Sequence, residues 1–476
     1  MEESKVIGRF EEVKILNNLL KTNESELVAV IGRRRVGKTF LVKKTYEKQM
    51  IFKLTGIQDA SKKEQLENFS IALSEAYQSN VELKQPKSWL TAFNMLKTFI
   101  NNKTTKTKKV IFLDELPWLA SSRSGFLQAF DHFWNSWAVD QNIIVVISGS
   151  AATWMITNVL EHKGGLHNRV TKTIKLYPFT LSEVEEYFKS KNINLPRYDI
   201  LSIYMAIGGI PYYIKEVVRA DSAVSAINRI CFGKNAHLFG EFDKLYKSLF
   251  TNYQDHIAVI RALAKKHKGL TRNEILKETK LSTGGAFTLV LRELEESSFI
   301  ESYRPYGKKE RDTLYRIYDE FSLFFIDFIE RNKNNDEFWI KNSNVTSVKT
   351  WSGYSFESVC IKHIKPIIKA LGISGISTEQ FSFYKPKSEH GEGFQIDMLI
   401  DRLDNAINIC EMKYYNTEII LNADTSKMIR LRKANFIAAT KTKKQVMTTL
   451  ITTYGLVQNL HSSVIDQCIT MDVLFD

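Results

Sequence analysis

Short apolar runs alternate with longer amphipathic stretches along the first part of the chain. Four apolar runs lie at 27–31, 50–54, 110–113 and 142–147. Helical patterns, in which apolar residues recur every three or four positions, lie at 13–20, 61–77, 87–101 and 126–137. Short apolar runs predict buried strands, and strands that alternate with helices are typical of a parallel sheet with helices on both faces. We therefore predict a three-layer αβα fold for this part of the chain.

A glycine-rich turn of the form G-x-x-x-x-G-K-T follows the first apolar run, at 32–39. Its glycines permit backbone dihedrals that let successive N–H groups turn toward a phosphate, and the helix that follows adds a partial positive charge. Lys38 would reach the β- and γ-phosphates of ATP, and Thr39 would hold Mg²⁺. The predicted nucleotide-binding residues of this segment are Gly32, Arg35, Val36, Gly37, Lys38, Thr39 and Phe40. The alternative is an ordinary glycine turn between a strand and a helix.

Two adjacent acids, Asp114 and Glu115, follow the apolar run at 110–113. In a parallel sheet the carboxyl ends of the strands face the ligand crevice. Asp114 is therefore predicted to coordinate the Mg²⁺ of ATP, directly or through water, and Glu115 to polarise the attacking water as a general base. The alternative is a plain strand end followed by a turn.

Further candidates for contact with ATP lie at other ends of the predicted elements. Ser148 and Ser150 end the strand at 142–147, where a hydroxyl can touch the γ-phosphate or orient the water; simple strand termination is the alternative. Arg169, in a glycine loop before an alternating strand at 171–176, is a candidate arginine finger in cis or in trans, or a surface arginine. Gly8 and Arg9 form a turn into the helix at 13–20 that could close over an adenine.

A break in the helical segments that run to about residue 250 has the sequence Gly208-Gly209-Ile210-Pro211. A Gly-Gly-x-Pro sequence interrupts a helix, because glycine is a weak helix former and proline lacks a backbone donor. We expect this break to bend a helical subdomain back toward the nucleotide, which makes Pro211 a further candidate for nucleotide contact.

These motifs resemble the AAA+/STAND group of P-loop ATPases, in particular the archaeal-type ATPase family that is also widespread in bacteria. The matching features are Gly8-Arg9, the Walker A loop at 32–39, the Walker B stretch at 111–115 with Pro117-Trp118, Gly149-Ser150-Ala151, the segment at 164–169 before Pro178-Phe179, and Gly209-Ile210-Pro211. The resemblance covers residues 1–250 and implies a parallel αβα core with a small helical lid. The chain departs from the family pattern in one respect, since no clear sensor arginine lies near Pro211.

Residues 251–320 show three helical patterns followed by a strand, a turn and a second strand, which predicts a winged helix-turn-helix. Its recognition helix would span 283–297 and offers Arg292 as its only cationic base reader, while the wing carries Lys308, Lys309 and Arg311. Cationic wings typically contact nucleic-acid phosphates. Two uses stay open: phosphate contact through the wing, or protein contact and coupling between domains.

A last unit is predicted from about residue 351, with a helix followed by strands at 394–400 and 406–414. Asp397 lies in the first strand, and Glu411 and Lys413 share one face of the second, because strand side chains alternate with period two. Asp397, Glu411 and Glu357 from the helix are candidate metal ligands, and Lys413 could activate a metal-bound water. This set resembles the PD-(D/E)XK nuclease fold. The alternative is a degenerate fold kept for binding.

Composition adds a charge argument and a compartment. The net charge is +13, with a surplus of ten basic residues in 1–254 and of four in 255–316. Nucleic acid, DNA before RNA, is one partner that would explain this surplus, and a lysine-rich solvated surface is the other explanation. The four cysteines are scattered, which favours a reducing cytoplasm, and no apolar run is long enough for a membrane span.

The sequence therefore predicts a multidomain α/β protein in five parts. These are a P-loop ATPase core at 1–180, a helical lid at 181–250, a winged helix-turn-helix at 251–320, a helical linker at 321–350, and a restriction-endonuclease-like α/β domain at 351–476. The hypothesis is an ATP- and Mg²⁺-dependent switch, with homo-oligomers possible, that controls a metal-dependent nuclease-like domain. The alternative is a regulatory or signalling ATPase whose last two domains only bind DNA or a protein partner.

Overall fold

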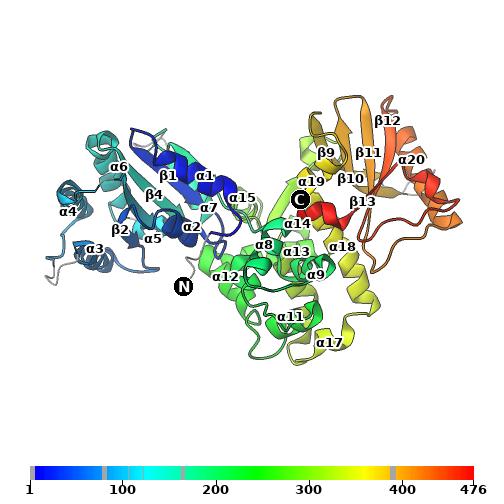
Figure 1. Ribbon diagram of the computed structural model, residues 1–476, viewed down its shortest axis with the longest axis horizontal. Coiled ribbons are helices and arrows are strands. Elements are labelled where there is room, and N and C mark those ends of the chain that lie inside the picture. Colours follow the sequence, from blue (N-terminus) through cyan, green and yellow to red (C-terminus); the bar gives the residue numbers. More distant parts are fainter. Residues whose placement is uncertain are drawn as a thin grey trace. The chain divides into compact units, whose positions relative to one another are not determined.

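The structure is a computed structural model that describes residues 6–77, 83–105, 107–121, 123–161, 166, 168–385 and 393–476. Two compact units divide the chain, Met1–Pro178 and Phe179–Asp476 (Figure 1). Among the described residues, no helix combines the length and the apolar character that a membrane crossing requires.

The first unit is built on a five-stranded sheet in the order β2-β3-β4-β1-β5, with every neighbouring pair parallel. The strands are β1 (Glu26–Ile31), β2 (Met50–Thr55), β3 (Lys109–Asp114), β4 (Ile143–Gly149) and β5 (Lys172–Lys175). The helices are α1 (Phe10–Leu19), α2 (Lys38–Thr45), α3 (Lys62–Tyr77), α4 (Trp89–Asn102), α5 (Leu116–Leu119), α6 (Phe126–Ser136) and α7 (Ala152–Met155), with a 3₁₀ turn at Ala138–Asp140 and a π-turn at Ile156–Leu160. The predicted parallel αβα core is confirmed.

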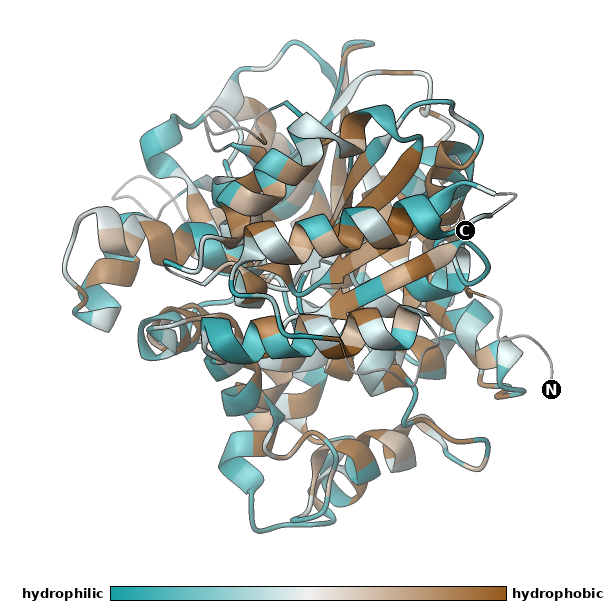
Figure 2. Cartoon of the chain, turned by 90° about the vertical axis from the view of Figure 1, so that its left-hand side faces the viewer, coloured by the Kyte–Doolittle hydropathy of each residue, from teal (hydrophilic) through white to brown (hydrophobic). Residues whose placement is uncertain are grey.

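The strands of this sheet have uninterrupted apolar sequences because helices cover both of its faces. Every residue of β1 and β4 is buried. A strand buried on both faces has no solvent side on which polar residues could alternate, so it reads as a continuous apolar run. The helices carry teal on one side and brown on the other, while the strands behind them are largely brown (Figure 2).

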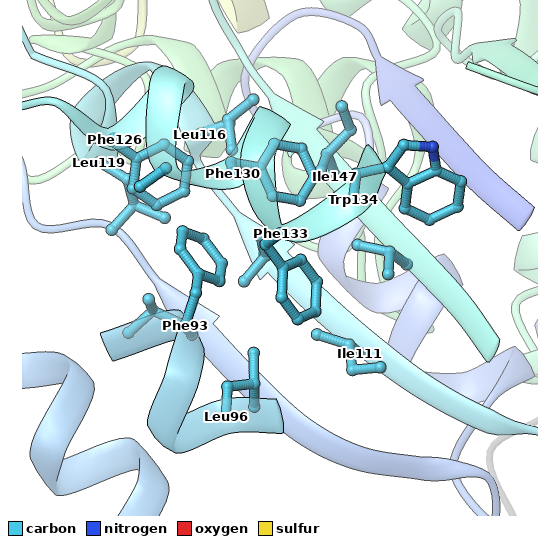
Figure 3. Close-up of a cluster of buried hydrophobic side chains, with 14 of the residues drawn as sticks. Phe93, Leu96, Ile111, Leu116, Leu119, Phe126, Phe130, Phe133, Trp134 and Ile147 are labelled. Carbon is cyan, nitrogen blue, oxygen red and sulfur yellow. The ribbon is translucent and has the colours of Figure 1, made fainter. Parts of the chain in front are cut away.

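An aromatic cluster fills the layer where α4 and α6 pack against the sheet (Figure 3). The rings of Phe93 and Phe133 stack with centroids 5.0 Å apart, and Trp89 meets Phe126 edge-on at 4.7 Å. Buried aromatic side chains each remove roughly 150–250 Å² from water, so this cluster supplies much of the hydrophobic stabilisation of the unit. The aromatic residues at 126–137 are thus largely core, and His132 in the same helix is exposed.

The second unit begins with the helices of the segment predicted as a lid. They are α8 (Leu181–Ser190), α9 (Arg197–Ile207), α10 (Pro211–Ile214), α11 (Ala223–Cys231) and α12 (Glu241–Leu249). Thr180 accepts a hydrogen bond from the backbone of Glu183, whose side chain returns one, so the two residues form a capping box at the start of α8.

The break at Gly208-Gly209 has a steric cause that the sequence did not reveal. A Cβ on Gly209 would lie 1.9 Å from the carbonyl oxygen of Phe179, and the Phe179 N–H donates to the Gly209 carbonyl at 2.6 Å. Gly208 has a φ of 66°, and a Cβ there would lie 2.9 Å from the carboxylate of Glu320. The glycines therefore let the chain between α9 and α10 pack directly on the segment that enters the unit.

Three helices and a small sheet follow, in the region predicted as a winged helix-turn-helix. They are α13 (Tyr253–Ala264), β6 (Leu270–Thr271), α14 (Arg272–Thr279), α15 (Gly285–Glu296), β7 (Ile300–Tyr303) and β8 (Leu314–Ile317), with a 3₁₀ turn at Glu310–Asp312. The sheet order is β6-β8-β7, and both pairings are antiparallel. The helix predicted at 283–297 is α15.

Aromatic helices lead from this region into a second five-stranded sheet. The helices are α16 (Glu320–Phe324), a π-turn (Phe325–Ile329), α17 (Phe338–Asn342), α18 (Thr346–Lys362), α19 (Ile364–Ala370) and α20 (Ala423–Thr440), with 3₁₀ turns at Glu330–Asn332, Ser462–Val464 and Met471–Phe475. The strands are β9 (Thr378–Lys385), β10 (Phe394–Arg402), β11 (Ala406–Lys413), β12 (Gln445–Thr452) and β13 (Gln467–Thr470). The position 351, where the last domain is predicted to begin, lies inside α18, and the helix continues through Gly353. The boundary stays a prediction.

This second sheet is mixed. Its order is β13-β12-β11-β10-β9, where β9, β10 and β11 pair antiparallel and β11, β12 and β13 pair parallel. The helix α20 connects the parallel strands β11 and β12, which is the crossover that parallel neighbours require. A register shift between Ile396 and Leu399 on β10 lies at Asp397.

His363 joins the start of the helical segment to the last domain. Its Nδ1 donates to the carbonyl of Val359 at 2.8 Å, and its Nε2 accepts the backbone N–H of Leu181, the first residue of α8, at 3.1 Å. Burial lowers the pKa of His363 to about 4. The neutral ring therefore satisfies a helix N-terminus that lies 182 positions away in the sequence.

We expect this histidine to make the second unit sensitive to acid. The unfolded chain keeps the ordinary pKa of 6.5, so between pH 6.5 and about 4 the unfolded state binds more protons than the folded state. The free energy of unfolding should fall through this window as the pH drops, by about 3 kcal/mol in total from this group. The temperature of thermal unfolding, measured at several pH values from about 7.5 to about 4.5, tests this expectation. This range brackets the reference pKa of roughly 6.5.

The variant His363→Gln keeps a hydrogen-bonding side chain but cannot titrate. It should unfold at a lower temperature than the wild type at neutral pH and lose less on acidification. His132→Gln, at an exposed position, is the matched control and should follow the wild type. Parallel pH profiles for the wild type and His363→Gln would contradict the assignment.

Candidate functional site

The glycine loop lies between β1 and α2, as its sequence predicted. Gly32 has a φ of 151°, and a Cβ there would lie 2.4 Å from the carbonyl oxygen of Leu176, so backbone packing leaves room for glycine alone. Gly37 has a φ of 94° and caps α2, and Arg35 has a φ of 76°. Left-handed residues within a short turn bring successive N–H groups to one side, which is the geometry of an anion-binding nest.

Lys38 is folded back onto this loop. Its Nζ donates to the carbonyl oxygens of Gly32 at 2.8 Å and Arg33 at 3.1 Å. Burial lowers the pKa of Lys38, and the carboxylates of Glu115 and Asp114 partly oppose that shift. The ammonium group thus lies inside the loop where a phosphate would bind, among acceptors that a stronger anionic acceptor can replace.

Behind the loop, the buried carboxylate of Asp114 interacts with residues of three elements, α2, β4 and β2. Asp114, at the end of β3, accepts a hydrogen bond from the Thr39 hydroxyl at 2.9 Å and another from the Ser148 hydroxyl at the end of β4. Lys53 on β2 lies 4.0 Å from the same carboxylate. The prediction that Ser148 touches the γ-phosphate or orients the water stays a prediction; in the structure its hydroxyl donates to Asp114. Lys53 was missed, because a lysine in an apolar strand gives no sign of which carboxylate it faces.

Glu115 is held by the residue that follows the β4 strand. Its carboxylate accepts the Ser150 backbone N–H at 3.1 Å and also the Ser150 hydroxyl. Glu115 has a φ of 53°, a left-handed conformation that directs the side chain away from the line of β3. The predicted general base is therefore positioned by Ser150, at the same edge of the sheet as Asp114.

Arg9 has a role in the structure that its sequence position did not indicate. It is buried with a φ of 57°, and its Nη2 donates to the carbonyls of Tyr177 at 2.6 Å and Val36 at 3.4 Å. The guanidinium thus ties the start of α1 to the glycine loop and to the end of the unit. The contact with adenine predicted for Gly8 and Arg9 stays a prediction.

Three other candidates lie outside these contacts. Phe40 is 49% exposed on α2, and Arg169 is exposed before β5. Part of the glycine loop before Arg169, at 162–165 and 167, lies outside the described residues. Pro211 is the first residue of α10 in the second unit. Contact of these three residues with nucleotide stays a prediction.

The residues around Asp114 fit a hydrated Mg²⁺. The ion prefers oxygen ligands, usually one or two protein oxygens together with phosphate and water. The Thr39 hydroxyl and the Asp114 carboxylate are such a pair, and they already lie within hydrogen-bond distance of one another. Bound there, Mg²⁺ would neutralise charge on the β- and γ-phosphates.

A second group of charged side chains gathers in the last domain. Burial raises the pKa of Glu357 on α18 to about 8, with a further increase from the charges of Asp397 and Glu411 and an opposing effect from Lys413. The four predicted residues are thus close enough to act on one another. Asp397 accepts a hydrogen bond from the Gln395 amide at 2.6 Å.

These carboxylates are not gathered into a metal site. No group of three or more His, Cys, Asp or Glu side chains in the described part of the chain is arranged to hold a metal ion. Glu411 forms an ion pair with Arg432 of α20, and Lys413 lies 3.9 Å from its other oxygen. The guanidinium of Arg432 occupies the position beside Glu411 that a metal ion would need. Sequence reasoning missed Arg432, because nothing in the sequence pairs a helix position with a strand 21 residues earlier.

Comparison with known proteins agrees with the geometry of the first unit. Residues 7–217 match a family described as an ATPase domain predominantly from Archaea. An uncharacterised protein of Methanocaldococcus jannaschii is 27% identical over 408 residues, which make up 83% of this chain and 83% of that protein.

Two solved structures align with a large part of the chain. The Walker-type ATPase of Pyrococcus abyssi has a TM-score of 0.48 and 18% identity, covering 67% of this chain and 95% of that one. The ORC2 protein of Aeropyrum pernix, in its ADPNP–ADP complexes, has a TM-score of 0.40 and 13% identity, covering 71% of this chain and 95% of that one. The family match agrees with the resemblance predicted for the N-terminal part and supports a nucleotide-binding ATPase domain at residues 7–217.

Proposed function

We propose that the chain is an Mg²⁺-dependent, ATP-hydrolysing switch whose output is the C-terminal domain acting on nucleic acid. The observation that supports this best is the pair of hydrogen bonds from Thr39 and Ser148 to Asp114 behind the glycine loop. These bonds hold a phosphate-binding loop and an acidic strand end in the geometry that ATP and Mg²⁺ require before either binds.

Each residue of this site has a distinct proposed role. The loop N–H groups and Lys38 bind the β- and γ-phosphates, while Thr39 and Asp114 provide the oxygens for the ion. Glu115 accepts a proton from the attacking water as general base. Ser150 acts through Glu115 as a positioning residue, since its two hydrogen bonds fix the carboxylate at one place on the sheet edge.

Exposed Arg169 supports self-association as part of the proposal. A side chain that extends from the loop before β5 is available to the nucleotide of a neighbouring copy, as an arginine finger in trans requires. We place such an assembly in the cytoplasm, in keeping with four cysteines that form no disulfide among the described residues.

The mixed sheet supports a nuclease-like output. Asp397 on β10 and Glu411 and Lys413 on the antiparallel neighbour β11 follow the pattern of the PD-(D/E)XK fold, and Glu357 lies close enough to interact with them. Cleavage requires that Glu411 leave its ion pair with Arg432, because a carboxylate neutralised in this way cannot serve the reaction centre.

A second candidate is a regulatory ATPase whose C-terminal domain only binds its partner. The Glu411–Arg432 pair favours it, since a partly buried pair of this kind is also what a degenerate, purely structural site would contain. The regions predicted as winged helix and nuclease-like domain would then bind DNA or a protein without cleaving it.

The first prediction concerns nucleotide binding. Lys38→Ala should abolish ATP binding, because the loop loses the cation that faces the β- and γ-phosphates. Isothermal titration with ATP and Mg²⁺ measures the affinity. Lys48→Ala removes an exposed lysine shortly after the same helix and should bind ATP as the wild type does. Unchanged affinity in Lys38→Ala would sink the assignment of the loop.

The second prediction concerns Ser150. Ser150→Ala removes the hydroxyl bond to Glu115 and should lower kcat for ATP hydrolysis about tenfold with little change in ATP affinity, as expected for the loss of one hydrogen bond to a charged group. Glu115→Gln should reduce kcat by about 10²–10⁴. Ser150→Thr keeps the hydroxyl and should restore most of the rate. A Ser150→Ala enzyme with normal kcat would show that the contact does not position the base.

The third prediction separates the two candidate outputs. Plasmid DNA, linear DNA and RNA are incubated with the full chain in Mg²⁺ or Mn²⁺, with and without ATP. The nuclease hypothesis expects cleavage that is lost in Asp397→Ala and in Glu411→Ala and retained in Glu379→Ala, which removes an exposed acid from the same sheet. ATP hydrolysis without cleavage of any substrate would support the regulatory ATPase.

A further inference from the structure

Two cavities lie on either side of Glu357, and they differ in size and in lining. The smaller one, of about 40 Å³, lies between the predicted winged helix and the last domain and includes His267, Arg316 and Asp397. The larger one, of about 670 Å³, includes Lys413 and residues of α9, α11 and α18. These elements contact one another and lie side by side (Figure 1). Glu357 therefore lines both cavities.

The approach from the winged-helix side is closed. The Tyr306 N–H donates to the carbonyl of Ser382 on β9 at 2.7 Å, and the Tyr306 ring contacts Phe381 and Phe436. The His267 ring stacks on Tyr354 with centroids 4.6 Å apart. A space of this volume holds little more than a water molecule, so a nucleic-acid strand cannot reach Asp397 from this side in the observed arrangement.

The larger cleft has the dimensions of a ligand site. Pockets of about 300–1,000 Å³ enclose ligands of the size of a few linked rings, which includes one or two nucleotides and excludes a double helix. Glu357 and Lys413 line it, as do Tyr414 and Tyr415, which follow Lys413 directly in the chain. A strand that enters the cleft would thus bring a phosphodiester to the charged cluster.

The tyrosines of this cleft form a prearranged stack. The Tyr414 ring lies parallel to Tyr198 of α9 at 5.2 Å, and Tyr198 stacks in turn on Tyr454 at 5.6 Å. The Tyr414 hydroxyl is 2.8 Å from the Ser202 hydroxyl. Tyr415 is held at its backbone by Thr453 and exposes 52% of its surface, so its ring is free to receive a base. Nucleobases stack on aromatic faces whatever their sequence.

Two lysines that line the cleft add positive charge to it. Lys349 is exposed at the α18 side, and the side chain of Lys413 is 39% exposed. Aromatic faces that alternate with lysines are the combination that binds single-stranded nucleic acid, with bases on the rings and phosphates on the cations. Asp199 and Glu357 also line the cleft, which disfavours a small free anion as the ligand, since a lone anion gains nothing from the rings to offset their charge.

We propose that this cleft binds single-stranded nucleic acid, or a strand separated from its duplex, and delivers it to Glu357 and Lys413. The inference rests on the proposed action of the C-terminal domain on nucleic acid and specifies the form of the substrate. Tyr415 stacks a base, and Lys349 contacts the backbone. The duplex is excluded by the size of the cleft on one side and by the winged-helix contacts on the other.

Fluorescence anisotropy with the full chain tests the proposal. Labelled single-stranded DNA, single-stranded RNA and duplex DNA of one sequence are titrated, and both single strands should bind more tightly than the duplex. Tyr415→Ala should weaken single-strand binding about tenfold, and Tyr415→Phe should bind as the wild type does, because the ring carries the contact. Tyr384→Ala, at an exposed tyrosine on β9 outside the lining of the cleft, is the matched control and should be unchanged.

A charge reversal tests the backbone contact independently. Lys349→Glu should weaken single-strand binding and make it less dependent on salt, because one phosphate contact is lost. Lys369→Glu makes the same charge change at an exposed position of α19 outside the cleft and should have little effect. Far-ultraviolet circular dichroism verifies that each variant is folded.

The outcomes distinguish this inference from the proposed function on which it rests. Duplex binding as tight as single-strand binding, or equal affinities in Tyr415→Ala and Tyr384→Ala, would overturn the cleft and leave the nucleic-acid output standing. No binding of any nucleic acid by the wild type, with or without ATP, would overturn both. The ATPase assignment is tested separately by Lys38→Ala.

Discussion

The hydrogen bond from Thr39 to Asp114 is the interaction on which the nucleotide site depends. Thr39 follows β1 and Asp114 ends β3, and these strands are separated in the sheet by β4. Ser148, from β4, donates to the same carboxylate. A buried carboxylate is tolerated only when it is hydrogen-bonded and its charge is balanced, which here is the task of Lys53. One side chain therefore aligns the ends of three parallel strands, and the loop, the predicted base Glu115 and its partner Ser150 take their positions from that edge.

The sequence predicted those features whose physics is local. Apolar runs became buried strands, and the glycine loop lies at the end of β1. The contacts between distant residues could not be predicted. Nothing local pairs Ser150 with Glu115 or Arg432 with Glu411, because such pairs depend on how elements pack. Gly353, near the predicted boundary at 351, lies within a helix, and the boundary itself stays a prediction.

The second unit ties its first helix to its last domain through buried polar groups. His363 accepts the first N–H of α8, and Lys362, its neighbour, forms a buried ion pair with Glu320, against which Gly208 packs. Burying polar groups is costly unless each is paired, so a displacement of α8 would leave the buried His363 ring without the hydrogen bond that it accepts from Leu181. The predicted lid and the C-terminal domain are therefore energetically coupled, which is what a switch with a distant output requires.

In the charged cluster of the last domain, the negative charges of Glu357 and Glu411 are offset by groups of the protein itself. A pKa of about 8 keeps the Glu357 carboxyl largely protonated at neutral pH, and Arg432 neutralises Glu411. Like-charged carboxylates in a shared, partly buried site repel one another unless a proton or a cation intervenes. Here the proton on Glu357 and the guanidinium of Arg432 do so. The resting arrangement thus needs no ion for its stability. Lys413 lies 3.9 Å from Glu411, so a phosphate that approached this lysine would compete with Glu411 for it.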